Sequence, residues 1–249
     1  MQAALVAGQR GHAVQLWEQS AQLGGQIRFA YMAPFKEEMA GILNYLKNAL
    51  QNSPVVVRLG RPVRASEIAA FEPDAVVVAT GSRPGLPNIP GIDTARVVQA
   101  RDLYDGPWPA GERVLVIGGG DIGCETAEWL AASGRQVNIV EITPRVLSRM
   151  KNIPRERLMA RLVEKKVRIY TETQIVSIAA CNVHLKKKDG QEFKLAADLV
   201  VLCINAHSED DLFHELQDTI KEVIAVGDAA SPGNLGTALR NATEAALKI

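Results

Sequence analysis

Three glycines with the spacing G-x-G-x-x-G are the residues whose arrangement most directly suggests chemistry. Gly118, Gly120 and Gly123 lie between the apolar run 114–117 and a helical pattern. In such a turn, glycine permits the tight bend, lets the backbone approach a pyrophosphate and lets the helix pack closely against the strand. The first turn of the helix then offers free N–H groups to the phosphates. The alternative is a glycine-rich turn that holds no ligand.

An acidic residue follows the next strand, at the place where this kind of site needs one. Glu141 stands 18 residues after Gly123, where a carboxylate can accept both ribose hydroxyls of an adenosine. Its charge repels a 2′-phosphate and so favours NAD(H) over NADP(H), although Arg145 and Arg149 lie just downstream. The candidate site for a nicotinamide nucleotide consists of Gly118, Gly119, Gly120, Asp121, Ile122, Gly123 and Glu141.

The elements that must position these residues alternate between strands and helices. Short apolar or β-branched runs lie at 13–17, 54–58, 75–79, 114–117, 137–140 and 199–202. Helical patterns lie at 34–51, 123–133, 154–165 and 237–249. Strands that are apolar throughout are typical of a parallel sheet covered on both faces. The sequence therefore predicts an α/β fold of the doubly wound, Rossmann-like kind.

Glycine and proline residues mark where these predicted strands and helices end. Gly11 and Gly134 stand where two helices should stop before a new strand. The stretch 82–109 is rich in proline and glycine and is predicted to connect two domains. Asp189 and Gly190 lie between two strand-like runs and predict a hairpin.

Composition excludes several classes of function. The chain has 249 residues with 28 basic and 28 acidic side chains, so it has no net attraction for nucleic acid or anionic membranes. No apolar run approaches the ~20 residues of a membrane span, and the N-terminus lacks the features of a secretion signal. The three cysteines are far apart and form no CxxC pair, which argues against a metal centre or a disulfide framework. We expect a cytoplasmic protein without a metal site, and no motif marks a catalytic acid or base.

Four motifs occur in the order found in one group of proteins. They are Leu-Gly-Gly-Gln at 23–26, Val-Val-Ala-Thr-Gly-Ser-Arg-Pro at 77–84, the glycine loop at 117–123 and Ala-Val-Gly-Asp-Ala at 225–229. The chain thereby resembles the two-dinucleotide-binding-domain flavoprotein oxidoreductases. Within them it is similar to the C-terminal half of the 2,4-dienoyl-CoA reductase, trimethylamine dehydrogenase and histamine dehydrogenase family. The segments 206–209 and 212–216 are similar to the amine dehydrogenase branch.

The resemblance implies two interleaved Rossmann-like domains. Residues 1–105 and 208–249 would bind FAD, or ADP in its place, and residues 106–207 would bind the nicotinamide nucleotide. Glu18 would bind the adenosine ribose, and Gly25 with Gln26 would lie along the pyrophosphate. Thr80 and Gly81 would close over this first nucleotide, and Asp228 would accept a hydrogen bond from the ribityl chain. The alternatives are an exposed strand-end carboxylate for Glu18 and ordinary turn residues for Thr80, Gly81 and Asp228.

The sequence also departs from this family at definite places. Aligned on Gly11, Met1 falls just past the third glycine of the family's first loop, so the first strand and its glycine loop are absent. Ile204 and Asn205 replace a Thr-Gly pair at the end of the second domain's last strand. No motif provides the family's FMN and iron–sulfur sites.

These observations leave two functional hypotheses. The chain is a module that passes hydride between NAD(P)H and FAD, serving a further electron acceptor, which could be another protein. Alternatively, it is a truncated module that binds ADP or NAD without turnover. In that case the incomplete sheet would be completed by a partner chain or by self-association.

Overall fold

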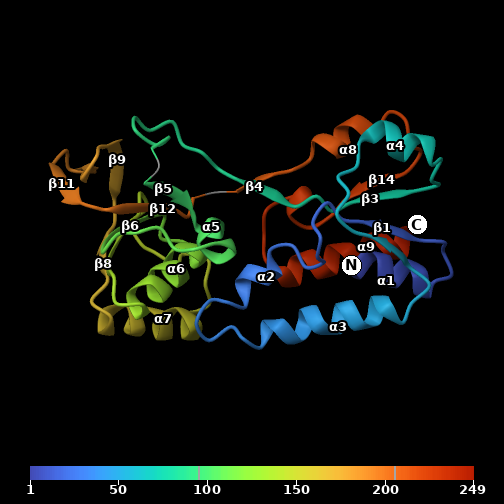
Figure 1. Ribbon diagram of the computed structural model, residues 1–249, viewed down its shortest axis with the longest axis horizontal. Helices are drawn as coiled ribbons and strands as arrows, with labels where there is room; N and C mark the ends of the chain where they lie inside the picture. The colour runs from blue at the N-terminus through green and yellow to red at the C-terminus, as the bar shows by residue number, and fades with distance from the viewer. Residues whose placement is uncertain (95, 205) are drawn as a thin grey trace. The chain divides into compact units, whose positions relative to one another are not determined.

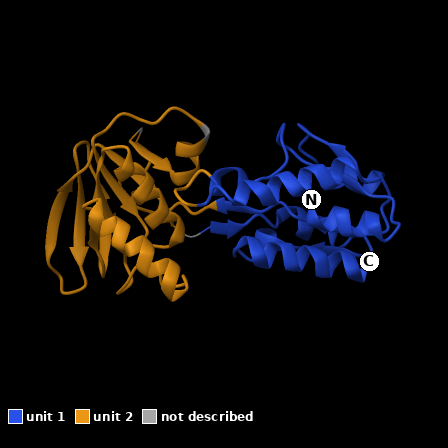
Figure 2. Cartoon of the chain, turned by 90° about the horizontal axis from the view of Figure 1, so that it is seen from below, with its two compact units in different colours: residues 1–31, 36–83, 206–249 blue, residues 32–35, 84–205 orange. Residues whose placement is uncertain are grey.

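The computed structural model describes residues 1–94, 96–204 and 206–249, so the predicted replacement at Asn205 lies outside the described residues. The chain divides into two compact units, which Figure 2 shows in blue and orange. Unit 1 consists of Met1–Tyr31, Lys36–Arg83 and Ala206–Ile249, and unit 2 of Met32–Phe35 and Pro84–Asn205. Both contain parallel strands with helices packed against them (Figure 1), so the predicted α/β class is confirmed. No helix in the described ranges is long and apolar enough to cross a membrane.

Unit 2 is built on a five-stranded parallel sheet with the order β5-β12-β6-β7-β8. The strands are β5 (Val97–Gln99), β6 (Arg113–Ile117), β7 (Gln136–Val140), β8 (Arg168–Tyr170) and β12 (Leu199–Leu202). Every residue of β12 is buried, and β6 is buried except at Arg113. Strands covered on both faces bury every side chain, which explains why the runs 114–117 and 199–202 contain no polar residue.

Helices cover one face of this sheet and a small antiparallel sheet covers the other (Figure 1). The helices are α5 (Ala100–Asp105), α6 (Asp121–Ala132) and α7 (Asn152–Glu164). The antiparallel strands are β9 (Thr173–Ile178), β10 (Asn182–Lys187) and β11 (Glu192–Ala196). Val116 packs toward the helices with Leu130, whereas Leu115 packs toward the antiparallel sheet with Leu185. β10 and β11 join through Gly190 at φ +91°, which confirms the predicted hairpin.

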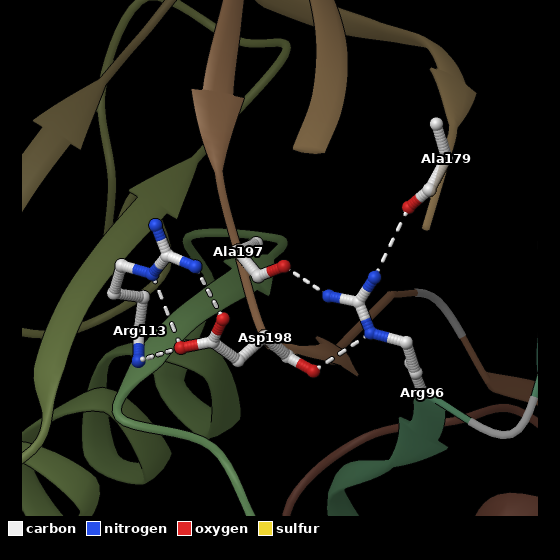
Figure 3. A network of polar contacts seen from close by, with 5 residues as sticks. All are labelled: Arg96, Arg113, Ala179, Ala197 and Asp198. Atoms are coloured by element: carbon white, nitrogen blue, oxygen red, sulfur yellow. Dashed lines mark hydrogen bonds and ion pairs between the residues drawn. The ribbon is translucent and has the colours of Figure 1, made fainter. Parts of the chain in front are cut away.

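An arginine fastens the antiparallel sheet to the parallel one (Figure 3). The Arg96 guanidinium donates hydrogen bonds to the carbonyl oxygens of Ala179 (3.2 Å), Asp198 (2.9 Å) and Ala197. Arg113 binds the Asp198 carboxylate through Nη2 (2.5 Å) and Nε (3.1 Å), and these bonds hold the pKa of that carboxyl below its usual value. Hydrogen bonds from charged donors are strong, so this network fixes the ends of β9 and β11 against the start of β12.

The proline- and glycine-rich stretch 82–109 contains ordered structure. Val97 and Val98 of β5 pair with β12, and Leu103 of α5 is 1% exposed in the core of unit 2. The sequence predicted residues 84–105 to be part of the first domain. The structure instead places them in unit 2, because their strand and helix pack into its core.

Unit 1 contains two pairs of parallel strands. β1 (Gln15–Trp17) pairs with β2 (Val56–Arg58), and β3 (Val76–Val78) pairs with β14 (Val223–Ala225). The helices are α1 (Gln2–Gln9), α2 (Ile27–Ala30), α3 (Met39–Gln51), α4 (Ala65–Ala70), α8 (Asp211–Leu216) and α9 (Leu235–Lys248). A short pair, β4 (Ser82–Pro84) with β13 (Ala206–Ser208), and a 3-10 turn, η1 (Gly227–Ala229), complete the elements. α1 is joined to α9 by Gln2 Nε2, which donates to Thr243 Oγ1 at 3.1 Å.

Backbone conformation explains where the helices stop and start. Gly11 after α1 and Gly134 after α6 have φ of +93° and +91°, so the two predicted helix stops are confirmed. The helix predicted over 34–51 begins only at Met39. Phe35 has a φ of +65°, which a right-handed helix cannot contain.

Three further helices begin two residues before their predicted starts at Gly123, Pro154 and Thr237. α6 begins at Asp121, α7 at Asn152 and α9 at Leu235. Asn234 caps α9, because its Oδ1 accepts a hydrogen bond from the Thr237 N–H at 3.0 Å. Gly123 therefore lies inside the first turn of α6 rather than at its first residue.

Candidate functional site

The glycine loop of unit 2 joins β6 to α6 through three residues of distinct conformation. Gly118 has a φ of +105°, and a Cβ there would lie 2.5 Å from the Cys203 carbonyl oxygen. A Cβ at Gly123 would overlap the Gly118 carbonyl oxygen. These two glycines are therefore required by packing alone, because the helix lies directly against the strand ends.

Gly120 differs from Gly118 and Gly123, because packing does not require a glycine at this position. Its φ of −71° and ψ of −173° suit any residue, and a Cβ there would meet nothing within 4 Å. No side chain of the described residues accepts a capping hydrogen bond at this start of α6. A helix start whose first N–H groups have no side-chain acceptor is suited to an anion such as a pyrophosphate. The described residues thus fit the phosphates of a nicotinamide nucleotide.

Glu141 lies directly after β7 and reaches the glycine loop. Its Oε2 accepts a hydrogen bond from the Gly119 N–H at 2.6 Å, and its Oε1 accepts one from the Thr143 N–H at 2.8 Å. The structure therefore brings Gly119 and Glu141 together. Two apolar side chains lie on exposed positions nearby in sequence, Ile122 at 58% and Ile142 at 68% exposure.

The loop after β7 contributes residues that the sequence did not mark. The Leu147 N–H donates to the Gly119 carbonyl at 2.8 Å, and Leu147 has a φ of +55°. A Cβ at Gly119 would overlap Val146, so this loop presses against the glycine turn. No short motif marks Val146 or Leu147, since their role depends on a contact between segments. For Thr143 the sequence gives one weak indication of a role at this site, because it lies two residues after Glu141.

A second polar cluster forms in unit 1 around Asp228. Its Oδ2 accepts hydrogen bonds from Ser82 Oγ (3.1 Å) and Gln26 Nε2 (3.3 Å), and its Oδ1 accepts one from the Gly233 N–H (2.9 Å). Gln26 Nε2 lies 3.0 Å from Ser82 Oγ as well. The structure thus brings the predicted residues Gln26 and Asp228 together and adds Ser82. A cluster of hydroxyl, amide and carboxylate groups is suited to a polyhydroxylated ligand.

The other predicted residues of unit 1 lie apart from a shared hydrogen-bond network. Gly25 has a φ of +48° and open space at its Cβ position. Glu18 accepts a hydrogen bond from the Ser20 N–H at 2.8 Å. Thr80 Oγ1 donates to the Glu209 carbonyl, and the Gly81 carbonyl accepts from the Glu209 N–H at 2.9 Å. Thr80 and Gly81 are thereby tied to the strand pair β4–β13.

The cysteines near the glycine loop are protonated thiols. Burial raises the pKa of both Cys124 and Cys203 to about 12. Cys124 Sγ donates to the Gly119 carbonyl at 3.5 Å, and Cys181 is exposed. A thiol reacts as its thiolate, so neither the buried Cys124 nor the partly buried Cys203 has the form needed for disulfide exchange at neutral pH.

The family model described as pyridine nucleotide-disulphide oxidoreductase matches residues 1–246. The chain belongs to this family. The pyridine nucleotide-disulphide oxidoreductases are flavoproteins, so membership implies binding of FAD and of a nicotinamide nucleotide. Unit 2 fits the second of these through its glycine loop. Unit 1 fits FAD at the Asp228 cluster, which suits a polyol.

The chain is similar to several members of the family. The chain is 35% identical to an NADH oxidase of Thermoanaerobacter brockii, covering 100% of this chain and 39% of that protein. It is 37% identical to a bilirubin reductase of Mediterraneibacter gnavus, covering 92% of this chain and 35% of that protein. A solved 2-naphthoyl-CoA reductase superposes with a TM-score of 0.94 at 26% identity, covering 100% of this chain and 38% of that one. The chain therefore spans less than two fifths of each of these family members.

Proposed function

We propose that the chain is an NAD(P)H-dependent oxidoreductase module that binds NAD(H) in unit 2 and FAD in unit 1. The observation that carries the proposal is the glycine loop. Two of its glycines are required by packing, whereas Gly120 faces open space at an uncapped helix start. A loop that served packing alone would not need glycine at position 120.

The residues of unit 2 would bind and orient the nucleotide. The N–H groups at the start of α6 would hold the pyrophosphate, and the Glu141 carboxylate would accept the hydroxyls of the adenosine ribose. Because both oxygens of Glu141 already accept backbone N–H groups, the carboxylate is held in position before any nucleotide arrives. Its negative charge would repel a 2′-phosphate, which favours NAD(H) over NADP(H).

The residues of unit 1 would hold the first nucleotide. Glu18 would bind the adenosine ribose, Gly25 and Gln26 would lie beside the pyrophosphate, and Asp228 would accept from the ribityl chain. Thr80 and Gly81 would close over this nucleotide. When bound, FAD supplies the isoalloxazine ring that exchanges hydride with the nicotinamide, and the protein contributes binding and orientation. No side chain need act as an acid or base in that exchange.

A second candidate is a module that binds ADP and NAD without turnover. The names of the relatives, NADH oxidase and bilirubin reductase, support the first candidate, and the second name suggests a small organic electron acceptor.

The visible absorption spectrum separates the two candidates. A redox module should retain or take up FAD and be yellow, and NADH should bleach its flavin absorbance under anaerobic conditions. A protein that binds NADH by calorimetry but cannot be reconstituted with FAD would establish the second candidate instead. Failure to bind NADH at all would refute both. Glu141→Ala should weaken NADH binding while leaving FAD uptake unchanged, because the two sites lie in different units.

A further inference from the structure

Within the described part of unit 1, a cavity of about 390 Å³ is lined by none of the residues proposed to hold FAD. It lies against the strand pair β1–β2 and beside the end of α4. A volume of this size is typical of sites that bind small organic molecules. Its polar and aromatic lining residues are Gln15, Trp17, Arg58, Arg61, Glu67 and Phe71.

The alternation of side chains along β1 explains on which face of the strand pair this cavity lies. Leu16 packs into the apolar cluster formed with α1 and α3. Because successive side chains of a strand point to opposite faces, Gln15 and Trp17 point away from these helices. Trp17 lies directly across from Arg58 of β2 in the strand register. The cavity therefore lies on the face of β1 and β2 that α1 and α3 do not cover.

The equivalent face of unit 2 is closed by other elements. Trp17 stands 123 residues before Val140 of β7, and a glutamate follows each of them. Val140 is 2% exposed and packs with Leu185 of the antiparallel sheet. Trp17 is only half-buried, because α4 packs Ile68 into a different cluster, around β3 and α8. Two similar strand pairs thus differ in this face, which is covered in unit 2 and accessible in unit 1.

The side-chain acceptors that line the cavity are already occupied. Gln15 Oε1 accepts hydrogen bonds from Trp17 Nε1 at 3.0 Å and from Arg58 Nε at 3.1 Å. Glu67 Oε1 pairs with Arg61 Nη2 at 2.6 Å, and its Oε2 accepts a backbone N–H at 3.1 Å. The terminal nitrogens of Arg58, in contrast, have no acceptor in the part of the chain that the structure describes. A ligand bound here must therefore supply acceptors, and two arginines against one glutamate favour an anion.

Two aromatic rings give the same cavity its apolar walls. The ring centroids of Trp17 and Phe71 lie 6.1 Å apart with an interplanar angle of 64°, and Phe71 is 52% exposed. The Arg61 guanidinium lies 5.5 Å from the centroid of the Trp17 ring, which helps to hold that ring in place. Accessible aromatic side chains offer their faces and edges to a further ring. These walls are suited to a flat, unsaturated ligand.

We propose that this cavity binds a planar aromatic carboxylate. The ring of the ligand packs against Trp17 and Phe71, and its carboxylate accepts hydrogen bonds from the terminal nitrogens of Arg58. A guanidinium group can bind a carboxylate through two parallel hydrogen bonds, which also orients the plane of the ligand. The inference concerns a binding site in unit 1 and does not depend on the redox chemistry proposed above.

The test uses coumarin-3-carboxylate, a planar aromatic anion, and its uncharged counterpart coumarin-3-carboxamide. Calorimetric titration of the full chain should show binding of the carboxylate and about tenfold weaker binding of the carboxamide, because the charged partner of Arg58 is lost. Arg58→Met keeps the length of the side chain and removes its donors, so it should weaken binding of the carboxylate about tenfold or more. Phe71→Ala removes one wall and should weaken it about threefold to tenfold.

Arg168→Met is the matched control, because Arg168 is an exposed arginine of β8, the strand that pairs with β7 as β2 pairs with β1. It should leave the affinity for the carboxylate unchanged. Equal affinity for both probes, unchanged binding in Arg58→Met, an equal loss in Arg168→Met, or no binding at millimolar probe would overturn the proposal. So would competition by NADH, since the probe would then occupy the nucleotide site of unit 2. The comparison of the two probes uses the unaltered chain, so it tests the proposal independently of how a variant folds.

Discussion

Replacing Gly120 by valine separates the ligand-binding role of the glycine loop from its packing role. The backbone at Gly120 is extended, with φ −71° and ψ −173°, and a Cβ there would meet nothing within 4 Å. The fold should therefore accept Gly120→Val. Valine restricts the unfolded chain more than glycine does, which stabilises the fold by about 0.4–1 kcal/mol. Valine is also a poorer helix cap than glycine, which costs a similar amount. The net change in the free energy of unfolding should therefore stay within about 1 kcal/mol.

NADH binding should respond much more strongly to the same change. A side chain at Gly120 would stand between the first turn of α6 and the phosphates. Loss of one hydrogen bond from a backbone N–H to a charged oxygen costs about 1.5–3 kcal/mol, which corresponds to binding that is about tenfold to a hundredfold weaker. Calorimetric titration with NADH measures the affinity, and urea unfolding measures the stability.

Gly123→Ala is the control, because it adds a side chain in the same loop at a position where packing leaves no room for one. Its Cβ would overlap the Gly118 carbonyl oxygen and lie 3.2 Å from the Cys203 Cβ. Overpacking of this kind should lower the free energy of unfolding by about 1–3 kcal/mol. Wild-type affinity for NADH in Gly120→Val would refute the reasoning, and so would a stability loss equal to that of Gly123→Ala.

Three further predictions concern unit 2 and the cysteines. Arg96→Ala should lower the free energy of unfolding, measured with urea, by about 2–4 kcal/mol, because three backbone carbonyls lose a charged donor. Arg96→Lys should restore only part of this loss, since an ammonium group lacks the planar fork of a guanidinium. The pKa of Asp198 is lowered in the folded state, so its contribution to stability is present above its usual pKa of about 3.9 and is lost as the pH falls below that value. Asp198→Asn should therefore flatten the acid side of the stability profile, and an unchanged profile would contradict the assignment. A thiol reagent at pH 8 should label Cys181 in the native chain and leave Cys124 and Cys203 unlabelled until the chain is unfolded, because burial raises the pKa of both to about 12.

Local patterns predicted much of the fold. Gly11 and Gly134 were recognised as helix stops because a left-handed residue after a helix is a short-range requirement that glycine meets. The start of α3 was missed, because the φ of +65° at Phe35 is not typical of phenylalanine. The placement of β5 in unit 2 was missed as well. Strand pairing between Val97 and Val200 joins distant segments, and no periodicity reports it.

The candidate site likewise contains some residues that the sequence predicted and others that it missed. The sequence pointed to the glycine loop and Glu141, since both belong to a spacing motif with a known physical purpose. It did not identify Ser82 in the Asp228 cluster, nor Val146 beside Gly119, because these residues act through contacts between separate loops. It also treated the three glycines alike, whereas the structure distinguishes Gly120 from its neighbours.

By itself, the sequence determined the α/β class, the order of the elements and the residues of the glycine loop, since each of these depends on residues close together along the chain. Only the tertiary structure decided which strands are neighbours, and with them that 84–105 packs in unit 2. The physical reason is that strand partners are chosen by side-chain packing and backbone hydrogen bonds between distant segments. Such interactions exist only once those segments have been brought together.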